Sequence, residues 1–144
     1  MSENLDNRKV IKKAKRIIIK VGSRVLVDKN GKPNLQRIKK IVNEISSINK
    51  KNIQIALVSS GAIGSGLEAL KFTTRPTKIA DLQMAAAVGQ LRLISIYDEL
   101  FSINKCQIGQ ILLTHDVLKN EHQYINAQNT LFNLLSNNII PIIN

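Results

Sequence analysis

Aromatic residues and cysteine are scarce in this 144-residue sequence. Phenylalanine, tyrosine and tryptophan together make up 3% of it, there is no tryptophan, and Cys106 is the single cysteine. Ile, Leu, Val and Ala must therefore fill the core, and no internal disulfide can form. A lone cysteine fits a reducing compartment, which predicts a cytoplasmic protein.

Long apolar runs are also missing from the sequence. No uninterrupted apolar stretch approaches the roughly 20 residues that cross a membrane, and the polar segment 1–16 lacks the apolar part of a signal peptide. We therefore expect no membrane partner. The length suits one domain, which would bury about two-thirds of the surface of its unfolded chain.

Acidic residues are few, and the formal net charge is +11. Residues 1–51 hold 15 of the 21 lysines and arginines, against four acids. No aromatic residue alternates with these lysines to stack on bases, and neither a helix-turn-helix pattern nor zinc-ligand spacing occurs. The excess of Lys, Asn and Ile is the residue usage of an AT-rich genome. We therefore expect no nucleic acid as a primary partner.

The first half of the sequence reads as strand, helix and strand. The run Ile17–Ile19, within the segment Arg16–Val27, is typical of a short strand buried on both faces. Asn30-Gly31 predicts a tight turn. Apolar residues then recur at helical spacing over residues 35–48, and Ile53–Ser60 repeats the buried-strand pattern. This is a βαβ unit, whose crossover should be right-handed.

The second half continues the alternation. A glycine-rich turn leads into a helix after Ser60, and a loop and Ala-rich helical segments follow. Further strands are predicted at Cys106–Thr114 and Ile139–Asn144, separated by a polar loop and a helix from about residue 125 to 136. The pattern predicts an α/β fold, a three-layer αβα sandwich with a mostly parallel sheet. We expect a basic arm over residues 1–15 and one domain over residues 16–144.

Ligands bind such sheets at the carboxyl ends of the strands. Lys20 ends the first predicted strand and is followed by Gly22-Ser23. Glycine lets backbone N–H groups approach an anion closely, and a lysine there can neutralise a phosphoryl group during transfer. The alternative is a surface lysine in a lysine-rich protein.

The segment Ser60-Gly61-Ala62-Ile63 follows the second predicted strand and opens a helix. N–H groups and the dipole at such a helix start form a cradle for an anion. The sequence contains no P-loop, and its glycines match neither the dinucleotide fingerprint nor the nucleophile elbow. A tight turn that packs the helix closely against the sheet explains these glycines as well.

Three other features favour structural interpretations. His115 and His122 are seven residues apart, match no metal-site spacing, and are expected in a solvated loop. Cys106 is expected in the core rather than as a nucleophile. Ala85–Ala87 with Gly89 predict a helix packed closely against another element, either within the chain or at a subunit interface.

Taken in order, these segments resemble the amino-acid kinase family and, within it, the glutamate 5-kinase branch. The resemblance covers about residues 16–144. The Ser-Gly-Ala-Ile turn and the Ala-Ala-Val-Gly-Gln helix are specific to the branch, whereas the Lys-x-Gly start is shared across the family. The segments that carry the resemblance are IIIKVGSRVL, ALVSSGAIGSG, MAAAVGQLRLISIYDELFS, CQIGQILLT and NAQNTLFNLLSNNIIPIIN.

The resemblance implies transfer of the ATP γ-phosphoryl group, with Mg²⁺, to the γ-carboxylate of L-glutamate, the first step of proline biosynthesis. It implies that Lys20 contacts the transferring phosphoryl group, with Gly22 and Ser23 beside the phosphates. It also implies that Ser60, the residues 61–63 after it, and Asn144 bind glutamate. No residue of this chain is implied as a metal ligand. Proline as a feedback inhibitor and a homo-oligomeric assembly are further family expectations.

The sequence departs from the family pattern after Asn144. The family continues there into an acidic substrate loop, a catalytic carboxylate, a second phosphate-binding lysine and the adenine-binding region. We therefore expect an incomplete kinase domain that is inactive alone, whether a fragment, a shortened gene product or one piece of a split enzyme. We also expect the final strand to leave a sheet edge unpaired. The alternatives are another amino-acid kinase, acting on acetylglutamate, aspartate or uridylate, and a non-catalytic binding module.

Overall fold

The computed structural model describes residues 13–28 and 32–144. The described elements, in chain order, are β1 (Arg16–Val21), α2 (Ser23–Leu26), α3 (Leu35–Asn49), β2 (Gln54–Ser59), α4 (Ala62–Ala69), α5 (Ile79–Ile103), β3 (Ile108–Ile111), α6 (His115–Lys119), α7 (Glu121–Ser136) and β4 (Ile140–Ile143).

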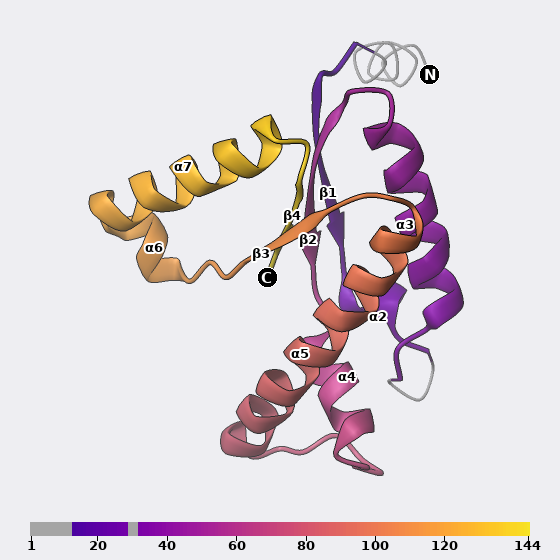
Figure 1. Cartoon of the computed structure of the whole chain (residues 1–144). Coiled ribbons are helices and arrows are strands. Elements are labelled where there is room, and N and C mark those ends of the chain that lie inside the picture. Colours follow the sequence, from indigo (N-terminus) through magenta and orange to yellow (C-terminus); the bar gives the residue numbers. More distant parts are fainter. Residues whose placement is uncertain (1–12, 29–31) are drawn as a thin grey trace, which may run out of the picture.

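The four strands form one sheet in the order β1-β2-β4-β3, and every neighbouring pair is parallel. Helices α3 and α5 lie on one side of the sheet and α7 lies on the other (Figure 1). The predicted three-layer αβα sandwich is therefore confirmed. Its strand order places β4 next to β2, although the two are far apart in the sequence.

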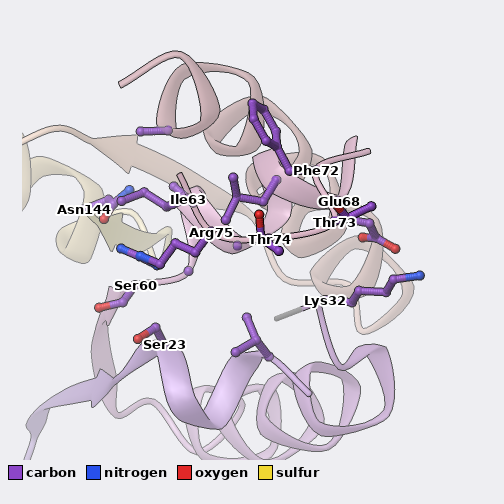
Figure 2. Close-up of a pocket in the computed structure, with 16 residues that line it drawn as sticks. Ser23, Lys32, Ser60, Ile63, Glu68, Phe72, Thr73, Thr74, Arg75 and Asn144 are labelled. Atoms are coloured by element: carbon purple, nitrogen blue, oxygen red, sulfur yellow. The ribbon is translucent and has the colours of Figure 1, made fainter. Parts of the chain in front are cut away.

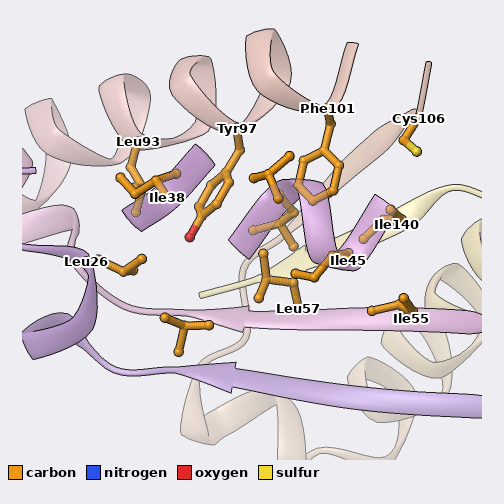
Figure 3. Packing of buried hydrophobic residues seen from close by; sticks show 13 residues of the cluster. Leu26, Ile38, Ile45, Ile55, Leu57, Leu93, Tyr97, Phe101, Cys106 and Ile140 are labelled. Atoms are coloured by element: carbon orange, nitrogen blue, oxygen red, sulfur yellow. The ribbon is translucent and has the colours of Figure 1, made fainter. Parts of the chain in front are cut away.

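The core lies between the sheet and the α3–α5 layer (Figure 3). Helix α3 turns Ile38, Val42 and Ile45 inward, at the i, i+4, i+7 spacing that puts three side chains on one helix face. Leu57 of β2 packs into the same cluster, which is mostly aliphatic, as the scarcity of aromatic residues predicts. The cluster includes the aromatic residues Phe101 and Tyr97, whose rings are 6.2 Å apart between centroids.

Strand β1 differs from its prediction. Ile17–Ile19 was expected to be buried on both faces, but Ile18 is 70% exposed. Because β1 is an edge strand and α7 packs mainly on β2 and β4, this face of β1 is only partly covered. Helix α7 reaches it at Arg16, whose guanidinium lies 5.1 Å from the centre of the Phe132 ring. Lys20 lies on the same face as Ile18, since alternate residues of a strand share a face.

The region between β3 and β4 also differs. The predicted polar loop is largely helical, because α6 occupies His115–Lys119 and α7 begins at Glu121 rather than near residue 125. The side chain of Asn120 accepts a hydrogen bond from the Gln123 N–H at 3.1 Å, which caps the start of α7. Asn at an N-cap with Gln three residues later is a helix-start signal, so this boundary was readable in the sequence.

Two expectations lie outside the described residues, and a third, on the last strand, is wrong. The expected basic arm falls mostly within residues 1–12, and the expected Asn30-Gly31 turn falls within 29–31, both outside the described residues. The expectation that the last strand forms an open edge is wrong. Strand β4 lies between β2 and β3, so the edges of the described sheet are β1 and β3.

Helix α5 is long and apolar enough to cross a membrane, by length and composition alone, and no other helix in the described ranges meets that test. The core helix of a globular domain meets it as well, so the observation is weak support for a span. Leu93 and Phe101 of α5 are buried in the core, although only 17% of the apolar 18-residue window of this helix is buried.

Candidate functional site

A cavity of about 660 Å³ opens at the carboxyl edge of the sheet (Figure 2). The start of α4, the loop between α4 and α5, the segment around α2, and the end of the chain all contribute to its wall. Its lining residues are Ser23, Val27, Lys32, Ser60, Gly61, Ala62, Ile63, Gly64, Leu67, Glu68, Phe72, Thr73, Thr74, Arg75, Ala86 and Asn144.

The turn between β2 and α4 forms one wall of the cavity. Gly61 has φ +108°, a left-handed conformation that side chains other than glycine rarely adopt. The Ser60 N–H donates to the carbonyl oxygen of Val21 at 3.1 Å, which joins this turn to the end of β1. The first N–H groups of α4 have no partner within the helix, so they are available to an anion in the cavity.

Asn144 reaches the same cavity from β4. Strands β2 and β4 are neighbours, with Val58 paired to Ile143, so the residues that follow them emerge side by side. The backbone N–H of Asn144 donates to the Ile111 carbonyl oxygen at 3.1 Å, which fixes its position beside β3. Its side-chain amide donates to the side-chain carbonyl oxygen of Gln90, on α5.

Helix α5 is pressed against α4 at two glycines. A Cβ added to Gly89 would lie 1.7 Å from the Ala62 carbonyl oxygen, and one added to Gly66 would lie 1.7 Å from the Ala85 carbonyl oxygen. No side chain fits at either position, so the prediction of a closely packed Ala- and Gly-rich helix is confirmed within the chain. This contact places Gln90 beside the cavity.

A buried hydrogen bond connects α5 with the end of β2. The Ser59 hydroxyl lies 3.1 Å from the carbonyl oxygen of Ser60 and 2.9 Å from the Tyr97 hydroxyl. A carbonyl oxygen can only accept, so Ser59 donates to it and Tyr97 donates to Ser59. Burial raises the pKa of the Tyr97 phenol above its ordinary value of 10.0.

The structure brings most of the sequence-predicted site residues together. Ser60, the residues 61–63, and Asn144 line the cavity, together with Ser23 from the phosphate-binding prediction. Lys20 and Gly22 do not line it. Lys20 is exposed and directly precedes Val21, whose carbonyl oxygen accepts from Ser60.

Several polar residues around the cavity carry no sequence prediction. The charged residues that line the cavity are Arg75, Lys32 and Glu68. Gln90 accepts a hydrogen bond from the side-chain amide of Asn144. The sequence held one local signal, at Arg75. Arg75 directly precedes Pro76 in a loop between two helices, and a residue before proline is biased toward extended backbone.

The described ranges contain no group of three or more His, Cys, Asp or Glu residues that could hold a metal ion. The N–H groups of the Ser60 turn suit anions rather than cations, so we assign no Mg²⁺ ligand to these residues. His115 and His122 lie on α6 and α7, so the expected loop is wrong for both, whereas His122 is exposed to solvent as expected. Cys106 is buried, as predicted.

Comparison with known proteins gives a consistent result. The model of the amino acid kinase family matches residues 15–144. Glutamate 5-kinases from Enterococcus faecalis and Clostridium perfringens are each 44% identical over 137 residues, which is 95% of this chain and 51% of each relative. A glutamate 5-kinase from Marinomonas is 39% identical over 140 residues, covering 97% of this chain and 37% of the relative.

A crystal structure of UMP kinase from Bacillus anthracis shares the fold, with a TM-score of 0.57 and 20% sequence identity. The match covers 90% of this chain and 52% of that one. The chain thus spans about half the length of the Enterococcus and Clostridium relatives. On the family match and the parallel αβα fold together, the chain belongs to the amino acid kinase family.

Proposed function

We propose that this chain forms the glutamate-binding part of a glutamate 5-kinase. The reaction is ATP-dependent phosphorylation of the L-glutamate γ-carboxylate, which yields glutamyl 5-phosphate for proline biosynthesis. One observation carries the proposal. Ser60 and Asn144, which the family resemblance assigns to glutamate, come from different strands and line one cavity. The names of the relatives, at up to 44% identity, support this substrate.

The reaction needs no covalent intermediate on the protein. A carboxylate is already a nucleophile, so the site must align it with the phosphoryl donor and reduce the repulsion between two anions. The Ser60 hydroxyl and the free N–H groups at the start of α4 can hold a carboxylate. The Asn144 carboxamide offers a polar contact to the amino-acid end of the substrate. ATP, with Mg²⁺, supplies the phosphoryl group when bound.

The proposal places Lys20, Gly22 and Ser23 on the phosphoryl side of the site. Ser23 lines the cavity, and Lys20 precedes the residue that is hydrogen-bonded to the Ser60 turn. A lysine there stabilises negative charge as it shifts between the two substrates. The Enterococcus and Clostridium relatives have about as many residues again as this match covers, and the proposal assigns nucleotide binding to that remainder. Residues 1–144 alone are then expected to bind glutamate without phosphorylating it.

A fused enzyme tests the proposal. In it, residues 1–144 are joined to the remaining half of the Enterococcus faecalis relative. ADP release is measured with L-glutamate, L-aspartate, N-acetyl-L-glutamate and UMP in turn. Activity with L-glutamate well above the other three is the expected result. Preference for UMP, aspartate or N-acetylglutamate would show that the chain belongs to another branch of the family.

A non-catalytic binding module is the second candidate function, favoured by the position of Lys20, which does not line the cavity. It retains the cavity and predicts glutamate binding by residues 1–144. The two candidates predict different results for the fused enzyme. If the chain is a non-catalytic module, that enzyme would fold and bind glutamate yet release no ADP. Turnover by the fused enzyme therefore decides between the two candidates.

A further inference from the structure

Arg75 is a positively charged residue at the cavity. It lies in the loop between α4 and α5 and lines the cavity together with Ser60 and Asn144. Its guanidinium end is directed toward the part of the cavity where those two residues lie (Figure 2). Within residues 13–28 and 32–144 it forms no hydrogen bond or ion pair. Glu68, the acidic residue of the lining, lies toward the opposite end beside Lys32 (Figure 2).

The loop that carries Arg75 is anchored at both ends. At its start, the Phe72 N–H donates to the Leu67 carbonyl oxygen at 2.9 Å, and the Lys71 N–H donates to the Glu68 backbone carbonyl oxygen at 3.0 Å. At its end, the Leu82 N–H donates to the Lys78 carbonyl oxygen at 3.2 Å. These bonds fix where the loop leaves α4 and enters α5, and Pro76 restricts the backbone beside Arg75.

The charge of the proposed substrate calls for such a group. L-Glutamate carries two carboxylates and one ammonium, so one anion-binding wall is insufficient. The Ser60 turn and the start of α4 can hold one carboxylate, and an unpaired guanidinium across the same cavity suits the second. Guanidinium and carboxylate match in geometry and form two parallel hydrogen bonds.

The two carboxylates are not equivalent in the reaction. The γ-carboxylate must attack phosphorus, and a two-bond contact with a guanidinium would stabilise its negative charge and so weaken it as a nucleophile. The α-carboxylate takes no part in bond making, so tight pairing there improves binding without slowing transfer. Resting on the function proposed above, we propose that Arg75 binds the α-carboxylate of the substrate and selects α-amino acids over simple ω-amino acids.

Two ligands isolate this contact. L-Glutamate has the α-carboxylate, whereas 4-aminobutyrate lacks it and keeps the ammonium and the other carboxylate. Dissociation constants for both are measured by calorimetry on residues 1–144 as wild type and as Arg75→Gln. Arg92→Gln on α5 is the matched control, because Arg92 is exposed and does not line this cavity. Lys32→Gln tests the opposite end of the cavity.

We expect wild type to bind glutamate about tenfold or more tightly than 4-aminobutyrate, the scale of a charge-assisted two-bond contact. Arg75→Gln should remove that preference by weakening glutamate alone, while Arg92→Gln and Lys32→Gln retain it. An unchanged preference in Arg75→Gln would overturn the assignment of Arg75 and leave the proposed function standing. No glutamate binding by folded wild type would overturn both. Thermal unfolding of each variant confirms that it is folded.

Discussion

The side-chain amide of Asn144 donates a hydrogen bond to the side-chain carbonyl oxygen of Gln90. The bond joins the end of β4 to α5. The bond uses an N–H of the Asn144 side chain and leaves the side-chain carbonyl oxygen of Asn144 as an acceptor for a ligand in the cavity. An acceptor at this point suits the ammonium group of an amino acid.

Gln90→Met should weaken glutamate binding by residues 1–144 several-fold, because the Asn144 amide loses the partner that orients it. Met has a similar shape and lacks a strong acceptor. Gln83→Met is the control, since Gln83 is an exposed residue of the same helix two turns earlier. Calorimetry with glutamate measures both variants. Equal affinity in the two would show that Gln90 does not position Asn144.

Lys20→Ala in the fused enzyme should lower kcat by a factor on the order of 10²–10³, the loss typical of one charge-stabilising donor. The glutamate KM should change far less, because the interaction strengthens as charge shifts in the transition state. Lys51→Ala, at an exposed residue beyond α3, is the control. A near wild-type kcat in Lys20→Ala would show that Lys20 is a surface lysine without a catalytic role.

Gly89→Ala should destabilise the fold by about 1–3 kcal/mol or more, the cost of overpacking a tight interface. Its new Cβ would fall 1.7 Å from the Ala62 carbonyl oxygen and 2.4 Å from the Gly66 nitrogen, both of them backbone atoms. Gly22→Ala is the control, because nothing lies within 4 Å of its added Cβ and its φ is −78°. Urea unfolding measures both. A Gly89→Ala protein as stable as Gly22→Ala would contradict the close packing of α4 on α5.

Tyr97 should make the protein lose stability at alkaline pH. Because burial raises its pKa in the folded state above the ordinary 10.0, the unfolded chain releases this proton at lower pH than the folded one. Stability is thus complete below about pH 10 and falls as the pH rises beyond it. The stability difference between wild type and Tyr97→Phe should be constant below that range and shrink above it. Urea unfolding over a pH series tests this, and a constant difference would contradict it.

The alternation of apolar segments was sufficient to predict the layers of the fold. Each buried strand pattern contained a strand, and Ser60 and Asn144 could be assigned to the same edge because both follow such patterns. The strand patterns alone could not predict how close these two residues lie. Their closeness depends on β4 inserting beside β2, and strand order is set by packing between segments that are far apart in the chain.

The exposed face of β1 shows the limit of local patterns. Three consecutive isoleucines describe a strand that could be covered on both faces, whereas the cover itself comes from helices elsewhere in the chain. The exposure of Ile18 therefore had no local signal. The start of α7 did have one, in Asn120 and Gln123, and it was outweighed by the polar composition of that segment.

Arg75 and Gln90 were missed for a related reason. Gln90 lies in the Ala-Ala-Val-Gly-Gln segment, which predicted helix packing and no site role, and Arg75 lies in no motif. Each reaches its position through tertiary structure. Gln90 is placed by the backbone contact of Gly89 with Ala62, and Arg75 by a loop anchored on both flanking helices. Only the folded arrangement of α4 and α5 brings Arg75 to the cavity and Gln90 to Asn144.

The most direct test is a titration of ¹⁵N-labelled residues 1–144 with L-glutamate and, separately, with ATP, followed by NMR. Glutamate should shift the backbone signals of residues 60–63 and the side-chain amide of Asn144, and ATP should leave them in place. Ser60→Ala should weaken glutamate binding about tenfold, as expected for about 1–3 kcal/mol per unpaired polar group, while the exposed control Ser102→Ala does not. If ATP shifts residues 60–63 and glutamate shifts nothing, this chain is not the glutamate-binding part of the enzyme.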